Sequence, residues 1–161
     1  MGYCITCVCL GNICRSPIAE VVIKDRLMTA GLADRVAVAS AGTGHWHVGQ
    51  DADPRARHAL ESAGYTFAHS ARQFEPGWFS TSDLVLAMDR ENLTNLRNLA
   101  ATYDEDPSHI RLFRSFDPTA PADAEVPDPY YGGEDGFTDV LHMVERAANG
   151  VVDSVAAQLD K

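Results

Sequence analysis

The sequence predicts a single three-layer α/β domain in which a four-stranded parallel sheet carries helices on both faces. Two observations favour this fold class. Short apolar runs, typical of buried strands, alternate along the chain with stretches whose apolar residues recur every three or four positions, as in amphipathic helices. Successive parallel strands need such crossover helices, which cover both faces of the sheet. A chain of 161 residues has the length of one domain, so residues 1–161 are expected to form a single folding unit.

Four short apolar segments are expected to form the strands. The second runs from Val36 to Ala41 as Val-Ala-Val-Ala-Ser-Ala, and the third carries Leu84, Val85 and Leu86 at its centre. Segments of this kind are typical of strands buried within a sheet. The predicted strands span residues 3–8, 36–41, 83–88 and 110–113.

Four longer stretches are expected to form helices. The first begins at Ser16-Pro17, because serine is a favoured N-cap residue and proline is tolerated at the first helical position. In the C-terminal helix apolar residues recur every three or four positions, and Gly150 is a weak point. The stretch 116–134 is rich in Pro, Asp and Gly and is expected to be a loop. The predicted helices span residues 16–30, 54–63, 90–101 and about 136 to the end.

The composition excludes several classes of protein. The formal net charge is −10 and the lysines are Lys24 and Lys161, so binding of nucleic acid is not expected. No apolar run is long enough to span a bilayer, and the first residues lack the basic lead of a signal peptide. All four cysteines lie within the first 14 residues, which argues against a disulfide framework. We therefore expect a cytoplasmic protein with no membrane partner.

The turn after the first predicted strand has the features of a phosphate-binding loop. Ligands bind at the carboxyl ends of parallel strands, and this turn leads from such an end into a helix, whose N–H groups and dipole attract anions. Gly11 and Asn12 tolerate a tightly curved backbone. The guanidinium group of Arg15 can hold two phosphate oxygens. The same positive field favours the thiolate form of Cys9, which is a competent nucleophile toward phosphorus.

At these residues the sequence resembles the low molecular weight protein tyrosine phosphatases of bacterial type. Their hallmark loop, Cys-x-Gly-Asn-x-Cys-Arg-Ser-Pro, is matched from Cys9 to Pro17. A second motif, Asp-Pro-Tyr-Tyr-Gly, stands at 128–132, and further likeness lies at 40–43 and 69–73. The separation of the motifs and the chain length agree with the family, so the resemblance covers essentially the whole domain. It implies that the phosphate contacts Leu10, Gly11, Asn12, Ile13, Cys14 and Ser16.

The resemblance also implies a general acid and an aromatic cleft. Asp128 corresponds to the family's acid, which protonates the phenol oxygen as it leaves, and Pro129 would help to aim its carboxyl group. Trp46, Tyr130 and Tyr131 correspond to aromatic walls that suit a flat phenyl ring. A deep cleft would also keep the phosphate of a short serine side chain away from the thiolate.

Further residues match a family network that shapes the loop and steadies the thiolate. In this network Ser40 and His69 act beside Asn12 and Ser16, and His69 bridges two loops. The family can also join the cysteines that correspond to Cys9 and Cys14 in a reversible disulfide.

No metal or other cofactor is expected, because the loop and Arg15 would hold the phosphate without one. His45 and His47 have the spacing of a metal pair, but the sequence offers no evident third ligand. Cys4 and Cys7 have a zinc-like spacing, but three residues along a strand place them on opposite faces.

These features predict a protein tyrosine phosphatase. Cys9 attacks phosphorus while Arg15 and the loop amides hold the oxygens, and Asp128 protonates the leaving phenol. Asp128 then activates the water that hydrolyses the phosphocysteine. The expected substrates are phosphotyrosine-containing proteins and small aryl phosphates. The resemblance further implies a tyrosine kinase as a partner, because the family's paired tyrosines can be phosphorylated.

Four alternatives are weighed against this prediction. Thioredoxin-coupled arsenate reductases share the loop but relay a disulfide to a downstream cysteine, and none follows Cys14. Arginine phosphatases of the same fold tend to carry threonine at the position of Ile13. A phosphate sensor without catalysis would not need both a nucleophile and an acid. A flavodoxin-like carrier suits the fold class, but no flavin-binding signal stands out.

Overall fold

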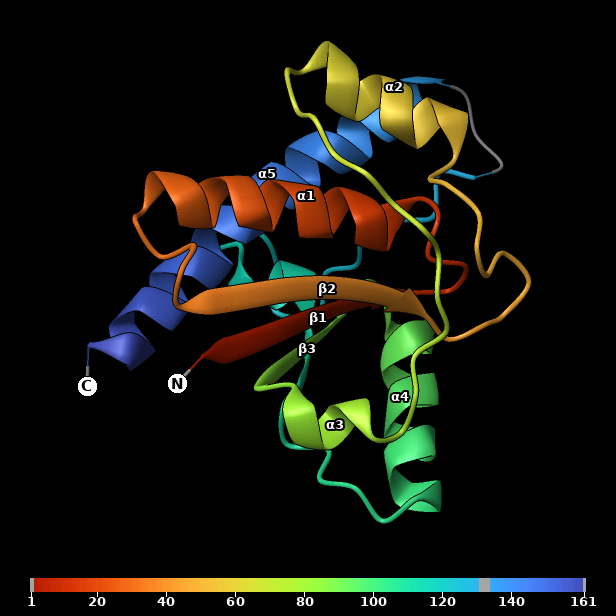
Figure 1. Cartoon of the computed structure of the whole chain (residues 1–161), viewed down its shortest axis with the longest axis vertical. Helices are drawn as coiled ribbons and strands as arrows, with labels where there is room; N and C mark the ends of the chain where they lie inside the picture. Colours follow the sequence, from red (N-terminus) through yellow and green to blue (C-terminus); the bar gives the residue numbers. More distant parts are fainter. Residues whose placement is uncertain (1, 131–133, 161) are drawn as a thin grey trace.

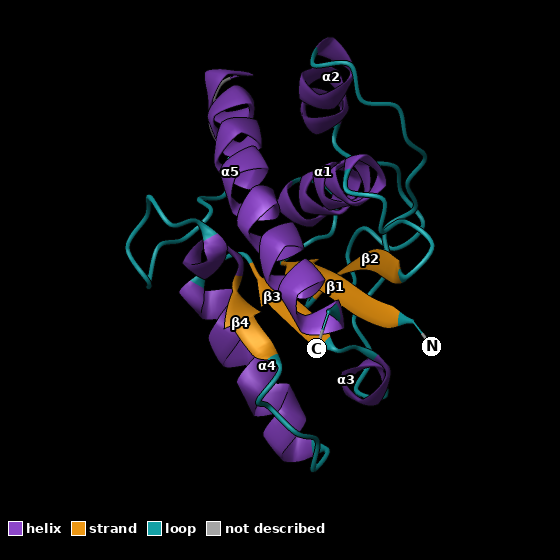
Figure 2. Cartoon of the chain, turned by 90° about the vertical axis from the view of Figure 1, so that its left-hand side faces the viewer, coloured by secondary structure: helices purple, strands orange, loops and turns teal. Residues whose placement is uncertain are grey.

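The computed structural model of the chain describes residues 2–130 and 134–160. In this part of the chain four parallel strands form one sheet in the order β2-β1-β3-β4 (Figure 2). The strands are β1 (Tyr3–Cys9), β2 (Val36–Gly42), β3 (Leu84–Ala87) and β4 (Ile110–Leu112). The chain leaves β1 toward β2 on one side and later adds β3 on the other. Such a reversal of direction opens a crevice at the carboxyl end of β1.

Helices cover both faces of this sheet, which confirms the predicted fold class. Helices α1 (Arg15–Thr29) and α5 (Glu134–Leu159) cover one face, and α2 (Pro54–Ser62) packs against α5 above them (Figure 1). Helices α3 (Trp78–Thr81) and α4 (Arg90–Thr102) lie on the opposite face. Within the described ranges, no helix is long and apolar enough to cross a membrane.

Two short elements were not expected from the sequence. Helix α3 and the 3₁₀ turn η1 (Phe113–Phe116) each have four residues. Hydrophobic periodicity cannot identify one turn of helix, because the pattern must repeat before it is visible. The eight predicted elements are present, and the stretch from residue 117 to 130 is irregular, as expected.

The core lies on both sides of the sheet because side chains alternate along β1. Ile5, Cys7 and Cys9 point into the larger cluster formed with α1 and α5. Val8 points into the cluster beneath α4. Cys7, which the sequence left without a role, is fully buried, and this burial raises the pKa of its thiol well above the ordinary value. Cys7 is therefore a small core residue.

The predicted start of the first helix is wrong by one residue, and the predicted cap is wrong. Helix α1 begins at Arg15 with Cys14 at the N-cap position, and none of the described side chains caps it. Ser16, predicted as the cap, lies inside the first turn, where its hydroxyl contacts the sulfur of Cys9 at 2.9 Å. Pro17 also lies in this turn, where a missing N–H removes no helical hydrogen bond. The hydroxyl group that was predicted to cap the helix therefore contacts the sulfur of Cys9 instead.

Gly150, a weak point in the predicted C-terminal helix, has a packing reason. A Cβ atom at this position would lie 1.8 Å from the carbonyl oxygen of Phe116. The absence of a side chain therefore lets η1 pack closely against α5. This contact fixes the end of the sheet to the helix that covers it.

We expect Gly150→Ala to destabilise the protein by about 1–3 kcal/mol, because overpacking outweighs the gain in helix propensity of about 1 kcal/mol. Gly136→Ala is the matched control in the same helix, since its Cβ would meet Pro129 at 3.7 Å, an ordinary contact. Urea unfolding followed by circular dichroism measures both. A Gly150→Ala variant as stable as the Gly136→Ala variant would contradict the packing argument.

Candidate active site

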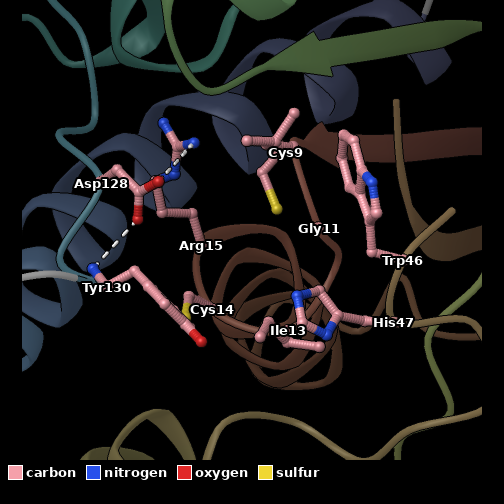
Figure 3. A pocket seen from close by; sticks show the side chains of 10 residues that line it. Cys9, Gly11, Ile13, Cys14, Arg15, Trp46, His47, Asp128 and Tyr130 are labelled. Atoms are coloured by element: carbon pink, nitrogen blue, oxygen red, sulfur yellow. Dashed lines mark hydrogen bonds and ion pairs between the residues drawn. The ribbon is translucent and has the colours of Figure 1, made fainter. Parts of the chain in front are cut away.

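The loop between β1 and α1 is built around the sulfur of Cys9. Cys9 is the last residue of β1 and is 2% exposed. Its sulfur lies 2.9 Å from the hydroxyl oxygen of Ser16 and accepts a hydrogen bond of 3.3 Å from the backbone N–H of Asn12. The first turn of α1 stands directly beneath it, so the positive end of a helix faces the sulfur (Figure 3). The sulfur of Cys9 is therefore surrounded by hydrogen-bonding groups and by the start of a helix.

Asn12 fixes the direction of the hydrogen bonds around that sulfur. It is fully buried and has a φ of 58°, in the left-handed region that asparagine tolerates. Its Oδ1 accepts the backbone N–H of Arg72, so its Nδ2 must donate to the hydroxyls of Ser16 and Ser40, at 2.8 and 3.0 Å. Ser16 accepts from Asn12, and its own proton has two acceptors within reach, the sulfur of Cys9 at 2.9 Å and the carbonyl of Ala41 at 3.3 Å. The network therefore places a hydroxyl donor beside the sulfur of Cys9, which is the nearer of the two acceptors.

The other members of the predicted network close this arrangement. Ser40 donates to Glu20 at 2.6 Å and so uses its single proton away from Asn12. His69 Nε2 lies 2.7 Å from the backbone carbonyl oxygen of Asn12. A carbonyl can only accept, so His69 must carry its hydrogen on Nε2. His69 thus connects its own segment to the loop after β1, and it is not among the residues that line the cavity.

The loop after β1 also forms backbone hydrogen bonds with the residues that follow β2. The N–H groups of Thr43 and Gly44 donate to the carbonyls of Cys9 and Leu10, each at 2.9 Å. Gly42 makes this possible, because a Cβ atom there would lie 2.7 Å from the carbonyl oxygen of Leu10. The two residues that follow β2 therefore hold the carbonyls of Cys9 and Leu10, while the N–H group of Asn12 points to the sulfur.

Arg15 is a buried cation with a fixed orientation. It is 2% exposed, and its Nη1 donates to Asp89 at 2.6 Å and to the carbonyl of Val126 at 3.0 Å. Burial alone would lower the pKa of Arg15, but Cys9 and Asp89 outweigh it and raise that pKa. The guanidinium is thus held charged in one position at the edge of the loop, while Nη2 faces Asp128 at 3.7 Å.

Asp128 stands on the other side of the crevice, in the irregular segment before α5. Its side chain is 38% exposed, and its Oδ1 accepts the backbone N–H of Tyr130 at 3.0 Å. The other oxygen faces Arg15 (Figure 3). The carboxyl group therefore borders the space above the cysteine sulfur, where a leaving group would emerge.

A cavity of about 300 Å³ opens above the sulfur of Cys9. Figure 3 shows Trp46 and His47 on one side of it and Asp128 and Tyr130 on the other. Trp46 is 62% exposed and packs its ring over Gly44. The cavity is lined by Cys9, Leu10, Gly11, Ile13, Cys14, Arg15, Trp46, His47, Asp128 and Tyr130.

Most residues predicted for the site come together here. Nine of them line the cavity, and Asn12, Ser16, Ser40 and His69 form the hydrogen-bonded layer beneath or beside it. The prediction for Tyr131 lies outside the described residues.

Two residues of the site were missed by sequence reasoning. Asp89, which orients Arg15, directly follows β3 and its flanking Met88, so its position at a strand's carboxyl end was an available signal. His47 has the spacing of a metal pair with His45, but in the structure it lines the cavity. Its neighbour Trp46 was the available signal.

The fold and the site define the class of this protein. It is a parallel α/β protein. The loop after its first strand is of the anion-binding type and is flanked by a buried cysteine and a buried arginine. The sequence profile of the family described as low molecular weight phosphotyrosine protein phosphatase matches residues 4–161. The chain belongs to this family.

Individual relatives agree with this assignment. The chain is 50% identical over 161 residues to a low molecular weight protein-tyrosine-phosphatase of Streptomyces coelicolor, covering 99% of this chain and 98% of that one. It is similar to a crystal structure of a protein tyrosine phosphatase from Entamoeba histolytica with Hepes in the active site. The TM-score is 0.90 at 35% identity, with 98% and 99% of the two chains covered. A Drosophila arginine phosphatase is also similar, with a TM-score of 0.87 at 29% identity and coverage of 94% and 96%.

We expect iodoacetate at neutral pH to alkylate Cys9 faster than Cys7 or Cys14. Burial raises the pKa of both Cys7 and Cys14, so their thiols stay protonated, whereas the sulfur of Cys9 accepts hydrogen bonds beside Arg15. Mass spectrometry of peptides after timed labelling measures this order, and inorganic phosphate should slow the reaction at Cys9. The Cys9→Ser variant is the control. Labelling of Cys14 as fast as that of Cys9 would contradict the expectation.

Proposed function

We propose that this chain hydrolyses phosphotyrosine with Cys9 as nucleophile, Arg15 as phosphate clamp and Asp128 as general acid. Membership of the family makes it a protein tyrosine phosphatase and hence a hydrolase, with phosphotyrosine-containing proteins as substrates. The observation that carries the proposed roles is the position of the Cys9 sulfur at the floor of the cavity, among N–H and O–H donors and beside a buried guanidinium.

The first step transfers the phosphoryl group to sulfur. The thiolate of Cys9 attacks phosphorus and forms the S–P bond while the bond from phosphorus to the phenol oxygen breaks. Arg15 and the loop N–H groups hold the equatorial oxygens, whose charge they stabilise in the transition state. Asp128 gives its proton to the phenol oxygen. The position of Asp128 in the cavity wall, beside Arg15 and opposite Trp46, supports this role (Figure 3).

The second step returns the enzyme to its starting state. Asp128, now a carboxylate, takes a proton from water as the water oxygen attacks phosphorus, and the S–P bond breaks to release inorganic phosphate. The electron pair returns to the sulfur of Cys9. The hydroxyl of Ser16, 2.9 Å away, would stabilise that thiolate as it leaves. The reaction is balanced by water alone and needs no cofactor.

The lining of the cavity supports an aryl substrate. Trp46 and Tyr130 face one another across the opening, and flat rings suit a phenyl group. The sulfur lies at the floor, so a phosphate must be carried on a long, flat side chain to reach it. Phosphotyrosine meets this condition, and small aryl phosphates share its leaving group.

Likeness of fold does not separate tyrosine from arginine phosphatases, since one of the latter is among the similar structures. The local residue that bears on this choice is Ile13, which lines the cavity. Arginine phosphatases of this fold tend to carry threonine there. An apolar side chain suits the edge of a phenyl ring better than a guanidinium group. We therefore favour phosphotyrosine.

The remaining expectations stand as proposals. A cytoplasmic location agrees with the four cysteines, which are free thiols in the structure. A tyrosine kinase is proposed as a partner that acts on Tyr130, which is 37% exposed at the rim of the cavity. Residues 1–161 are proposed to work as one domain, because one core cluster contains residues from β1, α1 and α5.

We expect hydrolysis of phenyl phosphate and of a phosphotyrosyl peptide in EDTA, with no activity in the Cys9→Ser variant. Asp128→Asn should lower kcat/KM by roughly 10²–10⁴-fold, the usual contribution of a general acid. Release of inorganic phosphate measures all three proteins, and a phosphoarginine peptide tests the competing substrate.

Undiminished turnover by Cys9→Ser would overturn the proposed mechanism. A kcat/KM for phosphoarginine above that for phosphotyrosine would overturn the proposed substrate.

A further inference from the structure

The acid and the phosphate loop lie on segments that are far apart in sequence. Two residues before the acid, the carbonyl of Val126 accepts a hydrogen bond from Arg15 at 3.0 Å, but the contact of the acid's own carboxyl group with Arg15 is weak. Asp128 Oδ2 lies 3.7 Å from Arg15 Nη2, which is an ion pair without a hydrogen bond. The segment before Tyr130 is irregular and its acid is 38% exposed. General acid catalysis requires the carboxyl group within hydrogen-bond reach of the leaving oxygen. A connection that follows Asp128 in sequence would therefore add to the one that Val126 makes before it, and would fix the direction of the carboxyl group.

Asp53, immediately before α2, is tied to the phosphate loop. Its backbone N–H donates to the carbonyl of Ile13 at 2.8 Å. Its buried carboxylate caps α2 through the N–H of Arg55 at 2.8 Å, and it also accepts both Nε and Nη2 of Arg55 at 3.1 Å. Burial alone would raise the pKa of Asp53, but these hydrogen bonds outweigh it and lower that pKa. The guanidinium of Arg55 is thus held by a two-point contact.

That guanidinium also contacts two aromatic rings, one in α5 and one in the segment that carries the acid. Its Cζ lies 4.7 Å from the ring centroid of Phe137, which is buried near the start of α5, and 5.4 Å from that of Tyr130. Both distances suit cation–π contacts. Tyr130 is the residue whose backbone N–H donates to Asp128 at 3.0 Å (Figure 3). An unbroken set of contacts therefore leads from Ile13 to Asp128.

We propose that Arg55 is a positioning residue that holds the general acid over the phosphate loop, through Asp53 on one side and Tyr130 on the other. The inference rests on the proposed role of Asp128. Recognition of an acidic group on the substrate is a weaker use of the same side chain, because the carboxylate of Asp53 already compensates its charge with two hydrogen bonds. The planar guanidinium suits both contacts at once, since it binds the carboxylate at its edge and the rings at its face.

The dependence of rate on the leaving group tests this role. Phenyl phosphate releases a basic oxygen that needs the acid's proton, whereas 2,4-dinitrophenyl phosphate releases an anion stable enough to leave without it. We expect Arg55→Gln to lower kcat/KM for phenyl phosphate roughly tenfold, a part of the 10²–10⁴-fold that a general acid contributes. The value for 2,4-dinitrophenyl phosphate should change less than about twofold. Arg55→Lys, which keeps the charge but loses the planar fork, should show the same selectivity in weaker form.

Arg57→Gln is the matched control on the same helix. Arg57 pairs with Asp51 at 2.6 Å and packs over the ring of Phe67 at 4.3 Å, so it has the same kinds of contact away from the acid. Its removal should leave the ratio of the two kcat/KM values unchanged. Thermal unfolding of each variant shows that the assays report folded protein.

The outcomes separate this inference from the proposed function. A selective loss with phenyl phosphate in Arg55→Gln or Arg55→Lys supports the inference. Equal losses with both substrates, or no loss in either variant, overturn it. Asp128→Asn is measured in parallel. If neither the Arg55 variants nor Asp128→Asn shows the selective loss, the proposed role of Asp128 is itself wrong. If Asp128→Asn shows it and the Arg55 variants do not, only the role of Arg55 is refuted.

Discussion

The structure depends on how the sulfur of Cys9 and the guanidinium cation of Arg15 are held near each other while both are almost completely buried. A buried charge is costly unless it is paired and hydrogen-bonded, so each group needs its own set of partners. Arg15 has Asp89 and a backbone carbonyl, and Cys9 has the donors of the loop and of Ser16. Removing one partner of such a buried pair costs about 3–5 kcal/mol, which explains why so many segments converge here.

The fold supplies those partners from segments that are distant along the chain. β1 ends at Cys9, the residues that follow β2 hold the outer carbonyls of the loop, and the end of β3 leads to the carboxylate that orients the arginine. Parallel strands place their carboxyl ends at one edge of the sheet, so the side chains that follow these strands lie close together. The acid arrives last in sequence, in an irregular segment that α2 and α5 border.

Sequence reasoning succeeded where the determining interactions are local. The strands and helices follow from hydrophobic periodicity, and their ends were placed within about two residues, since capping and turn signals act over a few positions. It failed where a residue has a second task. Ser16 has the side chain of an N-cap, but its hydroxyl is used by Cys9. Gly150 breaks the helical pattern, but its open face accepts the carbonyl of Phe116.

The sequence by itself determined the fold class and the loop after the first strand, and it supplied Cys9 as the proposed nucleophile, because the loop and this cysteine lie in one short continuous motif. The tertiary structure alone decided which distant side chains complete them. That Asp89 orients Arg15, that His47 lines the cavity and that Arg55 lies between Asp53 and Tyr130 all depend on contacts across the fold. Such contacts leave no periodic or short-range pattern, because they are fixed only when sheet and helices have packed together.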